Sequence, residues 1–170
     1  MAVSTGDEAP NFDLSSTEGV LLMLRDEVIR TTQLLYFFGD AGDERVRNDL
    51  DALNKGLDEL APLTCRVLAV SPVPLDALKA LQAERKLLFP LLHDDRNFSA
   101  AYGVAAEEGQ QPAPALFLVS RRQRILWHAN PAPAAAEALP QVVKLLKSQP
   151  SPTASYPKSV INRLVDRWVN

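Results

Sequence analysis

The chain has 170 residues, a length that suits one hydrophobic core and argues against a tandem of full-sized domains. Its 46% hydrophobic and 23% charged residues are typical of a folded globular protein and argue against wholesale disorder. The net charge of -3 gives no basic surface for nucleic acid, so we expect no nucleic-acid partner. No apolar run approaches the ~18 residues that span a bilayer, and residues Met1 to Asn11 lack the pattern of a secretion signal. We therefore expect no membrane association and a cytoplasmic location.

Cysteine and histidine are scarce, with one cysteine, Cys65, and two histidines, His93 and His128. A lone thiol cannot close an intramolecular disulfide, and a cysteine-rich zinc site is excluded. We expect neither a bound metal nor a cofactor.

The first predicted elements surround one strongly apolar strand. Short extended pieces are expected in Asn11–Leu24, and Asp26–Arg30 is too short for more than one turn of helix. The near-continuous apolar run Thr32–Phe38 predicts a strand buried on both faces. After a loop at Gly39–Gly42, an apolar stripe predicts an amphipathic helix capped by Asp40 or Asp43 and ended by Pro62. The stripe consists of Val46, Leu50, Leu53, Leu57 and Leu60.

The second half of the domain alternates in the same way. Strands are predicted at Arg66–Val70, Pro90–Leu92, Ala115–Val119 and Ile125–His128, and helices from Pro74 to about Lys86, at Asn97–Tyr102 and at Ala134–Leu146. The short connection Ser120–Arg124 makes the last two strands an antiparallel hairpin, and Pro140 interrupts or restarts the last helix. This order predicts an α/β sandwich with a mixed sheet, in which the two strands joined by the first long helix run parallel.

We predict three regions along the chain. Residues 1–147 form the domain, residues 148–158 are a linker rich in proline and serine, and residues 159–170 are an amphipathic C-terminal helix. The apolar face of this helix must be covered by the domain's own sheet or by a second subunit. A homodimer is therefore one of the expected assemblies.

Several sequence segments resemble, in order and spacing, those of the peroxiredoxin family (alkyl hydroperoxide reductase and thiol-specific antioxidant proteins). They are Gly6–Leu14, Gln33–Phe38, Val67–Ser71, Phe89–Asp94, Tyr102–Val104 and Ala115–Val119. The resemblance implies a thioredoxin-like fold, a three-layer sandwich in which a mixed central sheet is flanked by helices. It also implies an antioxidant oxidoreductase that reduces peroxides.

The family's chemical residues are replaced in this sequence. Carried over by position, the family pattern P-x-x-x-T-x-x-C places Gly39 at the proline, Asp43 at the threonine and Val46 at the cysteine that attacks the peroxide. Pro114 stands where the resemblance implies an arginine. A peroxide is split by a thiolate that positive charge stabilises, and valine has no lone pair to donate. The resemblance therefore implies a degenerate site with no catalytic residue. Val46 is interpreted as the first member of the helix stripe.

Two functional hypotheses remain open at this stage. In the first, the chain is a binding or structural module whose former active-site pocket holds a small ligand or a protein segment. In the second, it is a thiol oxidoreductase that works through Cys65 or a partner's thiol, so the sequence leaves enzymatic activity undecided. Cys65 precedes the strand Arg66–Val70, whereas the Gly39–Val46 loop follows a parallel strand. Five residues at ~3.3 Å each then place the two on the order of 15–20 Å apart.

Three further features of the sequence lead to expectations. By analogy with thioredoxin-like proteins, a cis peptide bond is predicted at Ala113–Pro114. His93 beside Asp94 and Asp95 is a candidate general base, although no nucleophile adjoins it. The basic cluster at Ser120–Arg124 is interpreted as a solvated turn.

Overall fold

The computed structural model describes residues 3–104 and 111–149 of the chain. In chain order its elements are β1 (Asp13–Ser15), β2 (Leu21–Met23), α1 (Leu24–Arg30), β3 (Thr32–Phe37), α2 (Glu44–Leu60), the 3-10 turn η1 (Ala61–Leu63), β4 (Cys65–Ser71), α3 (Leu75–Arg85), β5 (Leu91–His93), α4 (Asn97–Ala101), β6 (Ala115–Val119), β7 (Ile125–Ala129) and α5 (Ala135–Ser148). Among these helices, none combines the length and apolar character that a membrane span requires.

A five-stranded mixed sheet forms the centre, in the order β5-β4-β3-β6-β7. Strands β3, β4 and β5 run parallel, whereas β6 is antiparallel to β3 and β7 is antiparallel to β6. The predicted parallel pair and the predicted hairpin are both confirmed. Because β3 is central and five of its six residues are buried, its near-continuous apolar run follows from its place in the sheet.

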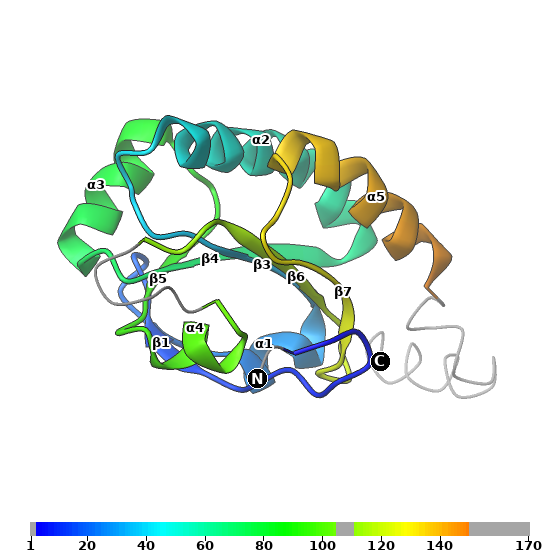
Figure 1. Ribbon diagram of the computed structural model, residues 1–170. Helices are drawn as coiled ribbons and strands as arrows, with labels where there is room; N and C mark the ends of the chain where they lie inside the picture. The colour runs from blue at the N-terminus through cyan, green and yellow to red at the C-terminus, as the bar shows by residue number, and fades with distance from the viewer. Residues whose placement is uncertain (1–2, 105–110, 150–170) are drawn as a thin grey trace, which may run out of the picture.

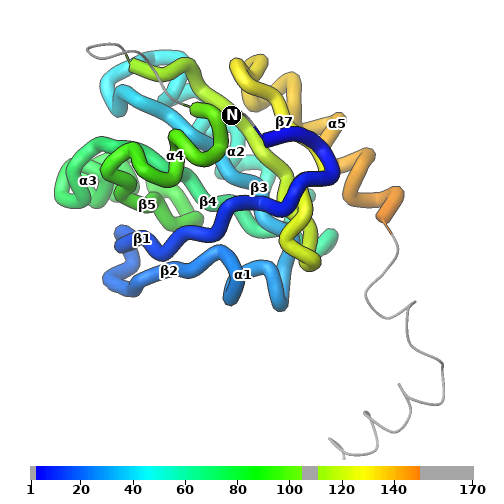
Figure 2. The backbone as a smooth tube through the Cα atoms, turned by 60° about the horizontal axis from the view of Figure 1, so that its bottom comes forward, coloured from blue at the N-terminus to red at the C-terminus, as the bar shows by residue number. Residues whose placement is uncertain are grey.

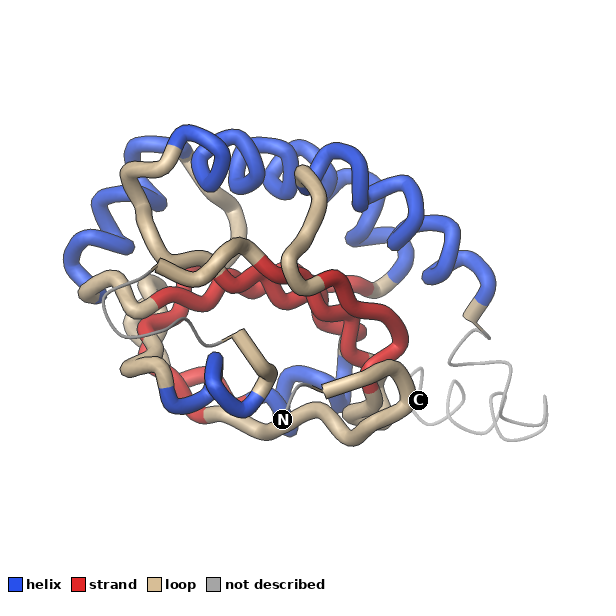
Figure 3. Tube along the Cα trace, in the orientation of Figure 1, coloured by secondary structure: helices blue, strands red, loops and turns tan. Residues whose placement is uncertain are grey.

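Helices α2, α3 and α5 cover one face of the sheet, and α1, α4 and the β1–β2 ribbon lie on the other (Figure 1 and Figure 3). Figure 2 shows the N-terminal segment crossing this second face beside α1 and α4. Side chains alternate between the two faces of the sheet along β3. Leu34, Tyr36 and Phe38 pack in the core under α2, and Leu35 and Phe37 pack in the core on the opposite face. The three-layer sandwich expected from the sequence is thus observed.

Four local expectations need correction or comment. Helix α1 has seven residues, more than the single turn predicted, because Leu24 and Val28 lie one turn apart and are both buried. Helix α5 runs through Pro140 without a break, since Pro140 and Ala136, whose carbonyl loses a partner, are both exposed. The helix also includes Ser148, the first residue of the predicted linker. Gln149 follows with an extended backbone, and residues 150–170, which include the rest of that linker and the predicted C-terminal helix, lie outside the described residues.

The predicted cis peptide bond at Ala113–Pro114 is wrong. Within the described ranges the cis bond is Asn130–Pro131. The prediction rested on fold analogy alone, and nothing in the local sequence distinguishes the two Xaa–Pro bonds.

Candidate functional site

The loop that follows β3 carries the degenerate positions, and its two acidic side chains bind their own backbone. The Asp43 carboxylate caps α2 by accepting from the Arg45 N–H at 2.9 Å, and the Asp40 carboxylate accepts from the Gly42 N–H at 2.8 Å. Acidic residues stabilise a helix start through these bonds and through the helix dipole. Asp43 and Asp40 therefore have a structural explanation at this position.

Val46 belongs to the hydrophobic core, with only 2% of its surface exposed. It lies in the cluster that includes Phe38 and Leu50, under helix α2. The prediction that Val46 packs inward as part of the stripe is confirmed. An apolar side chain in this environment supplies no group that can attack a peroxide.

Gly39 allows a neighbouring loop to lie against the end of β3. A Cβ atom at Gly39 would lie 2.6 Å from the Gln111 side-chain oxygen and 2.8 Å from Pro112 Cδ. Both distances are shorter than van der Waals contact. At the position of the family's proline, the missing side chain of Gly39 thus lets residues 111–112 lie against the backbone.

Pro114 is buried immediately before β6, whose first residue, Ala115, is the partner of Phe37 in β3. The Pro114 carbonyl accepts a hydrogen bond of 2.7 Å from the Ala132 N–H. This contact ties the start of β6 to the segment that leads into α5. Pro114 therefore lies near the end of β3, as the resemblance implies, but brings no positive charge to it.

A buried polar network that sequence reasoning missed links α2, β3 and α5. Asp49 is 2% exposed and accepts from the Tyr36 hydroxyl at 2.7 Å and from the Ala135 N–H at 2.9 Å. Arg45 lies 3.6 Å from the same carboxylate and donates to the Ala132 carbonyl. Burial, followed by the hydrogen bond to Asp49, raises the pKa of Tyr36 well above its usual range. One signal was available: Asp49 lies three residues after Val46, on the apolar side of the helix.

Cys65 is at the opposite end of the sheet from this loop. It begins β4 and is the partner of Thr32, the first residue of β3, whereas Gly39 follows the last residues of β3. Six residues at ~3.3 Å each separate the two ends by about 20 Å. The thiol is 5% exposed, and burial raises its pKa to about 12. The thiolate fraction near pH 7 is then on the order of one in 10⁵.

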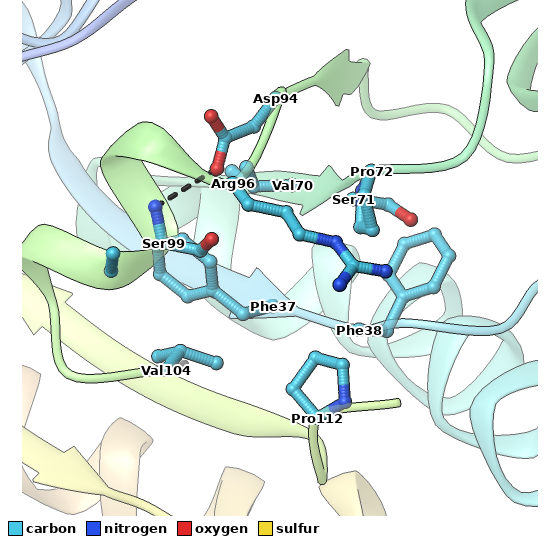
Figure 4. Close-up of a pocket in the computed structure, with 11 residues that line it drawn as sticks. Phe37, Phe38, Val70, Ser71, Pro72, Asp94, Arg96, Ser99, Val104 and Pro112 are labelled. Carbon is cyan, nitrogen blue, oxygen red and sulfur yellow. Dashed lines mark hydrogen bonds between the residues drawn. The ribbon is translucent and has the colours of Figure 1, made fainter. Parts of the chain in front are cut away.

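A cavity of about 190 Å³ lies at the carboxyl ends of β3 and β4, beside the degenerate positions (Figure 4). Val46, Asp43 and Pro114 do not line it. Its walls come from the ends of β3 and β4, from the segment around α4, and from Pro112. The lining residues are Phe37, Phe38, Val70, Ser71, Pro72, Asp94, Arg96, Ser99, Ala100, Val104 and Pro112. Of the residues carried over from the family, Val46 is packed in the core and Asp43 caps α2 at the surface, and the open space lies beside them.

His93 lies near this edge but is held by two acceptors. Its Nδ1 is 2.8 Å from the Val73 carbonyl oxygen, and its Nε2 is 2.9 Å from the Asp95 carboxylate. Both ring nitrogens therefore face acceptor atoms of the protein itself. This geometry does not favour the general base considered from the sequence. In the described ranges, no group of three or more His, Cys, Asp or Glu side chains is placed to hold a metal ion.

Comparison with known proteins places this architecture in context. A family model described as the AhpC/TSA family matches residues 5–128. No curated protein matches the chain in sequence.

Solved structures match the fold over most of the chain. Peroxidoxin BcpB from Mycobacterium tuberculosis aligns with a TM-score of 0.79 and 18% identity, covering 86% of this chain and 98% of that one. A PrxQ mutant from Xylella fastidiosa gives a TM-score of 0.78 and 20% identity, over 87% of this chain and 98% of that chain. AhpC from Mycobacterium tuberculosis gives 0.75 and 20%, over 87% and 93%. At these identities the matches show the fold, which is the thioredoxin-like α/β sandwich.

Proposed function

Because this chain belongs to the AhpC/TSA family, we propose that it is a member without peroxidase activity that acts as a binding or structural module. The observation that carries this proposal is the place of Val46 in the apolar core under α2, 2% exposed. The position that the resemblance assigns to the attacking sulfur holds a side chain that can neither lose a proton nor donate a lone pair.

The electrostatics at the same place support the proposal. A reactive thiolate needs positive charge or hydrogen-bond donors around it. Here the helix start is capped by the Asp43 carboxylate, and Pro114 stands where the family cation is expected. Arg45 and Arg47 are nearby cations, but Asp49 and the Ala132 carbonyl engage Arg45, while the Ala41 carbonyl and Glu84 engage Arg47.

The alternative, an oxidoreductase that works through Cys65 or a partner's thiol, has less support. Cys65 is buried at the far end of β4, and its pKa of about 12 keeps it protonated at neutral pH. A thiol in that state is a weak nucleophile toward peroxides and disulfides alike.

Peroxide turnover separates the two functions. The purified full chain is mixed with hydrogen peroxide or an alkyl hydroperoxide and with a thiol reductant. Peroxide loss is then compared with that of a Cys65→Ser variant and of a buffer blank. We expect all three to be equal. Turnover by the native chain that disappears in Cys65→Ser would overturn the proposal and support the oxidoreductase.

We also propose that the protein is a homodimer located in the cytoplasm. The sequence supports the dimer through the predicted apolar face of residues 159–169, and the single free cysteine suits a reducing compartment. Light scattering on the full chain tests the assembly, since a mass equal to one chain would reject it.

A further inference from the structure

The cavity at the carboxyl ends of β3 and β4 has an apolar body. Phe37, Phe38, Val70 and Val104 contribute carbon surfaces to it, and three of these four also belong to the core facing α1 and α4. Its volume of about 190 Å³ exceeds the ~150 Å³ of an engineered cavity that binds benzene. The space therefore suits a group about the size of one ring or a short branched chain.

Among the described residues that line this cavity, Arg96 is the cation. The Arg96 side chain extends across the opening toward Phe38 and Pro112 (Figure 4). Within residues 3–104 and 111–149, no carboxylate lies within ion-pair distance of its guanidinium, unlike Arg45, Arg47, Arg66 and Arg85. A guanidinium that has no acid partner among the described residues and lies beside an apolar space is suited to a planar carboxylate, which it can bind through two parallel hydrogen bonds.

The acidic residue of the same cavity is already satisfied. Asp94 is 2% exposed, and its carboxylate accepts from the Phe98 N–H at 3.2 Å and from the Ser99 N–H at 2.9 Å. Figure 4 shows this carboxylate turned toward the Ser99 backbone and the Arg96 guanidinium turned the other way. Asp94 thus organises the start of α4 and does not neutralise Arg96. Its negative charge nonetheless disfavours a ligand with two charges.

Two hydroxyls add hydrogen-bond donors. The Ser71 oxygen accepts from the Val73 N–H at 3.2 Å, which leaves its own proton free to donate. The Ser99 hydroxyl makes no hydrogen bond within the described part of the chain, and both serines line the cavity.

We propose that this cavity binds a small monocarboxylate with an apolar body of about one ring, with the carboxylate on Arg96. This inference rests on the proposed function, because it names the ligand class that a binding module of this shape would take. The phenyl ring of a probe such as 3-phenylpropionate would fill the space between Phe37, Val70 and Val104. Its carboxylate would then face the guanidinium and the serine hydroxyls.

The test uses the full chain, 3-phenylpropionate, and its neutral analogue 3-phenylpropanol, with binding followed by NMR titration. The variant Arg96→Gln removes the charge, and Arg122→Gln is the matched control, because Arg122 is an exposed arginine in the β6–β7 turn. Ala100→Phe fills the cavity from α4. We expect Arg96→Gln to weaken carboxylate binding on the order of 10- to 100-fold and to leave the alcohol unaffected. Arg122→Gln should match the native chain, and Ala100→Phe should abolish binding of both probes.

Three results would overturn the inference. They are an absence of carboxylate binding at millimolar concentration, equal affinity for the acid and the alcohol, and equal effects of the two arginine variants. Circular dichroism of each variant confirms that it is folded. These outcomes are distinguishable from failure of the proposed function, which the peroxide-turnover assay tests separately.

Discussion

Replacing Asp49 with alanine should destabilise the fold by about 3–5 kcal/mol, because the carboxylate is the shared acceptor of a buried network. The change leaves the Tyr36 hydroxyl and the Ala135 N–H without a partner, and both residues are completely buried. Each unpaired buried donor costs about 1–3 kcal/mol, and Arg45 loses its carboxylate as well. The contacts that are lost lie where α2 meets the start of α5, directly beside the degenerate loop.

Urea unfolding followed by circular dichroism measures this cost. Asp51→Ala is the matched control, since it removes the same side chain from the same helix. Asp51 is 38% exposed and pairs with Arg85 at 3.0 Å, so its loss should cost at most about 1 kcal/mol. Tyr36→Phe removes one donor and keeps the acceptor, and should cost about 1 kcal/mol. If Asp49→Ala destabilises no more than Asp51→Ala, the reasoning about the buried network is wrong.

Three further predictions concern the degenerate loop and the thiol. Gly39→Ala should lower the free energy of unfolding by about 1–3 kcal/mol because its Cβ would overlap residues 111–112. Gly42→Ala, whose nearest atom is a carboxylate oxygen at 3.3 Å, should cost clearly less in the same urea titration. Burial raises the pKa of Cys65 to about 12, so its alkylation by iodoacetamide should keep accelerating from pH 8 to pH 10. At pH 8 it should be on the order of 10³-fold slower than in the urea-unfolded chain, and equal rates would contradict the burial. Val46→Cys should fold and still show only background peroxide loss, because Asp43 and Pro114 remain. Peroxide turnover by Val46→Cys, but not by the native chain, would show that the missing sulfur alone accounts for the lack of peroxidase activity.

Much of the fold was predictable because local pattern and tertiary position agree. The apolar run within Thr32–Phe38 is near-continuous because β3 is the central strand, and the stripe from Val46 to Leu60 follows the helix face that packs on the sheet. The hairpin of β6 and β7 follows from its short connection. These elements require no knowledge of distant contacts.

The missed parts of the site depend mainly on distant contacts. The partners of Asp49 lie 13 residues before it and 86 residues after it, so no sequence window contains the network. The cavity forms where residues near positions 37, 71, 96 and 112 meet, and Arg96 stands in a segment with no motif of its own. The cis bond before Pro131, and not before Pro114, likewise has no signal in the local sequence.

The most direct test of the central claim is the reaction of the chain's one thiol with hydrogen peroxide. The native full-length protein is exposed to peroxide, and the oxidation of Cys65 is followed by mass spectrometry beside free cysteine at the same pH. With the thiol 5% exposed and its pKa raised to about 12, we predict oxidation slower than that of free cysteine. Oxidation faster than that of free cysteine would mean that an activated sulfur survives in this chain and would contradict the account.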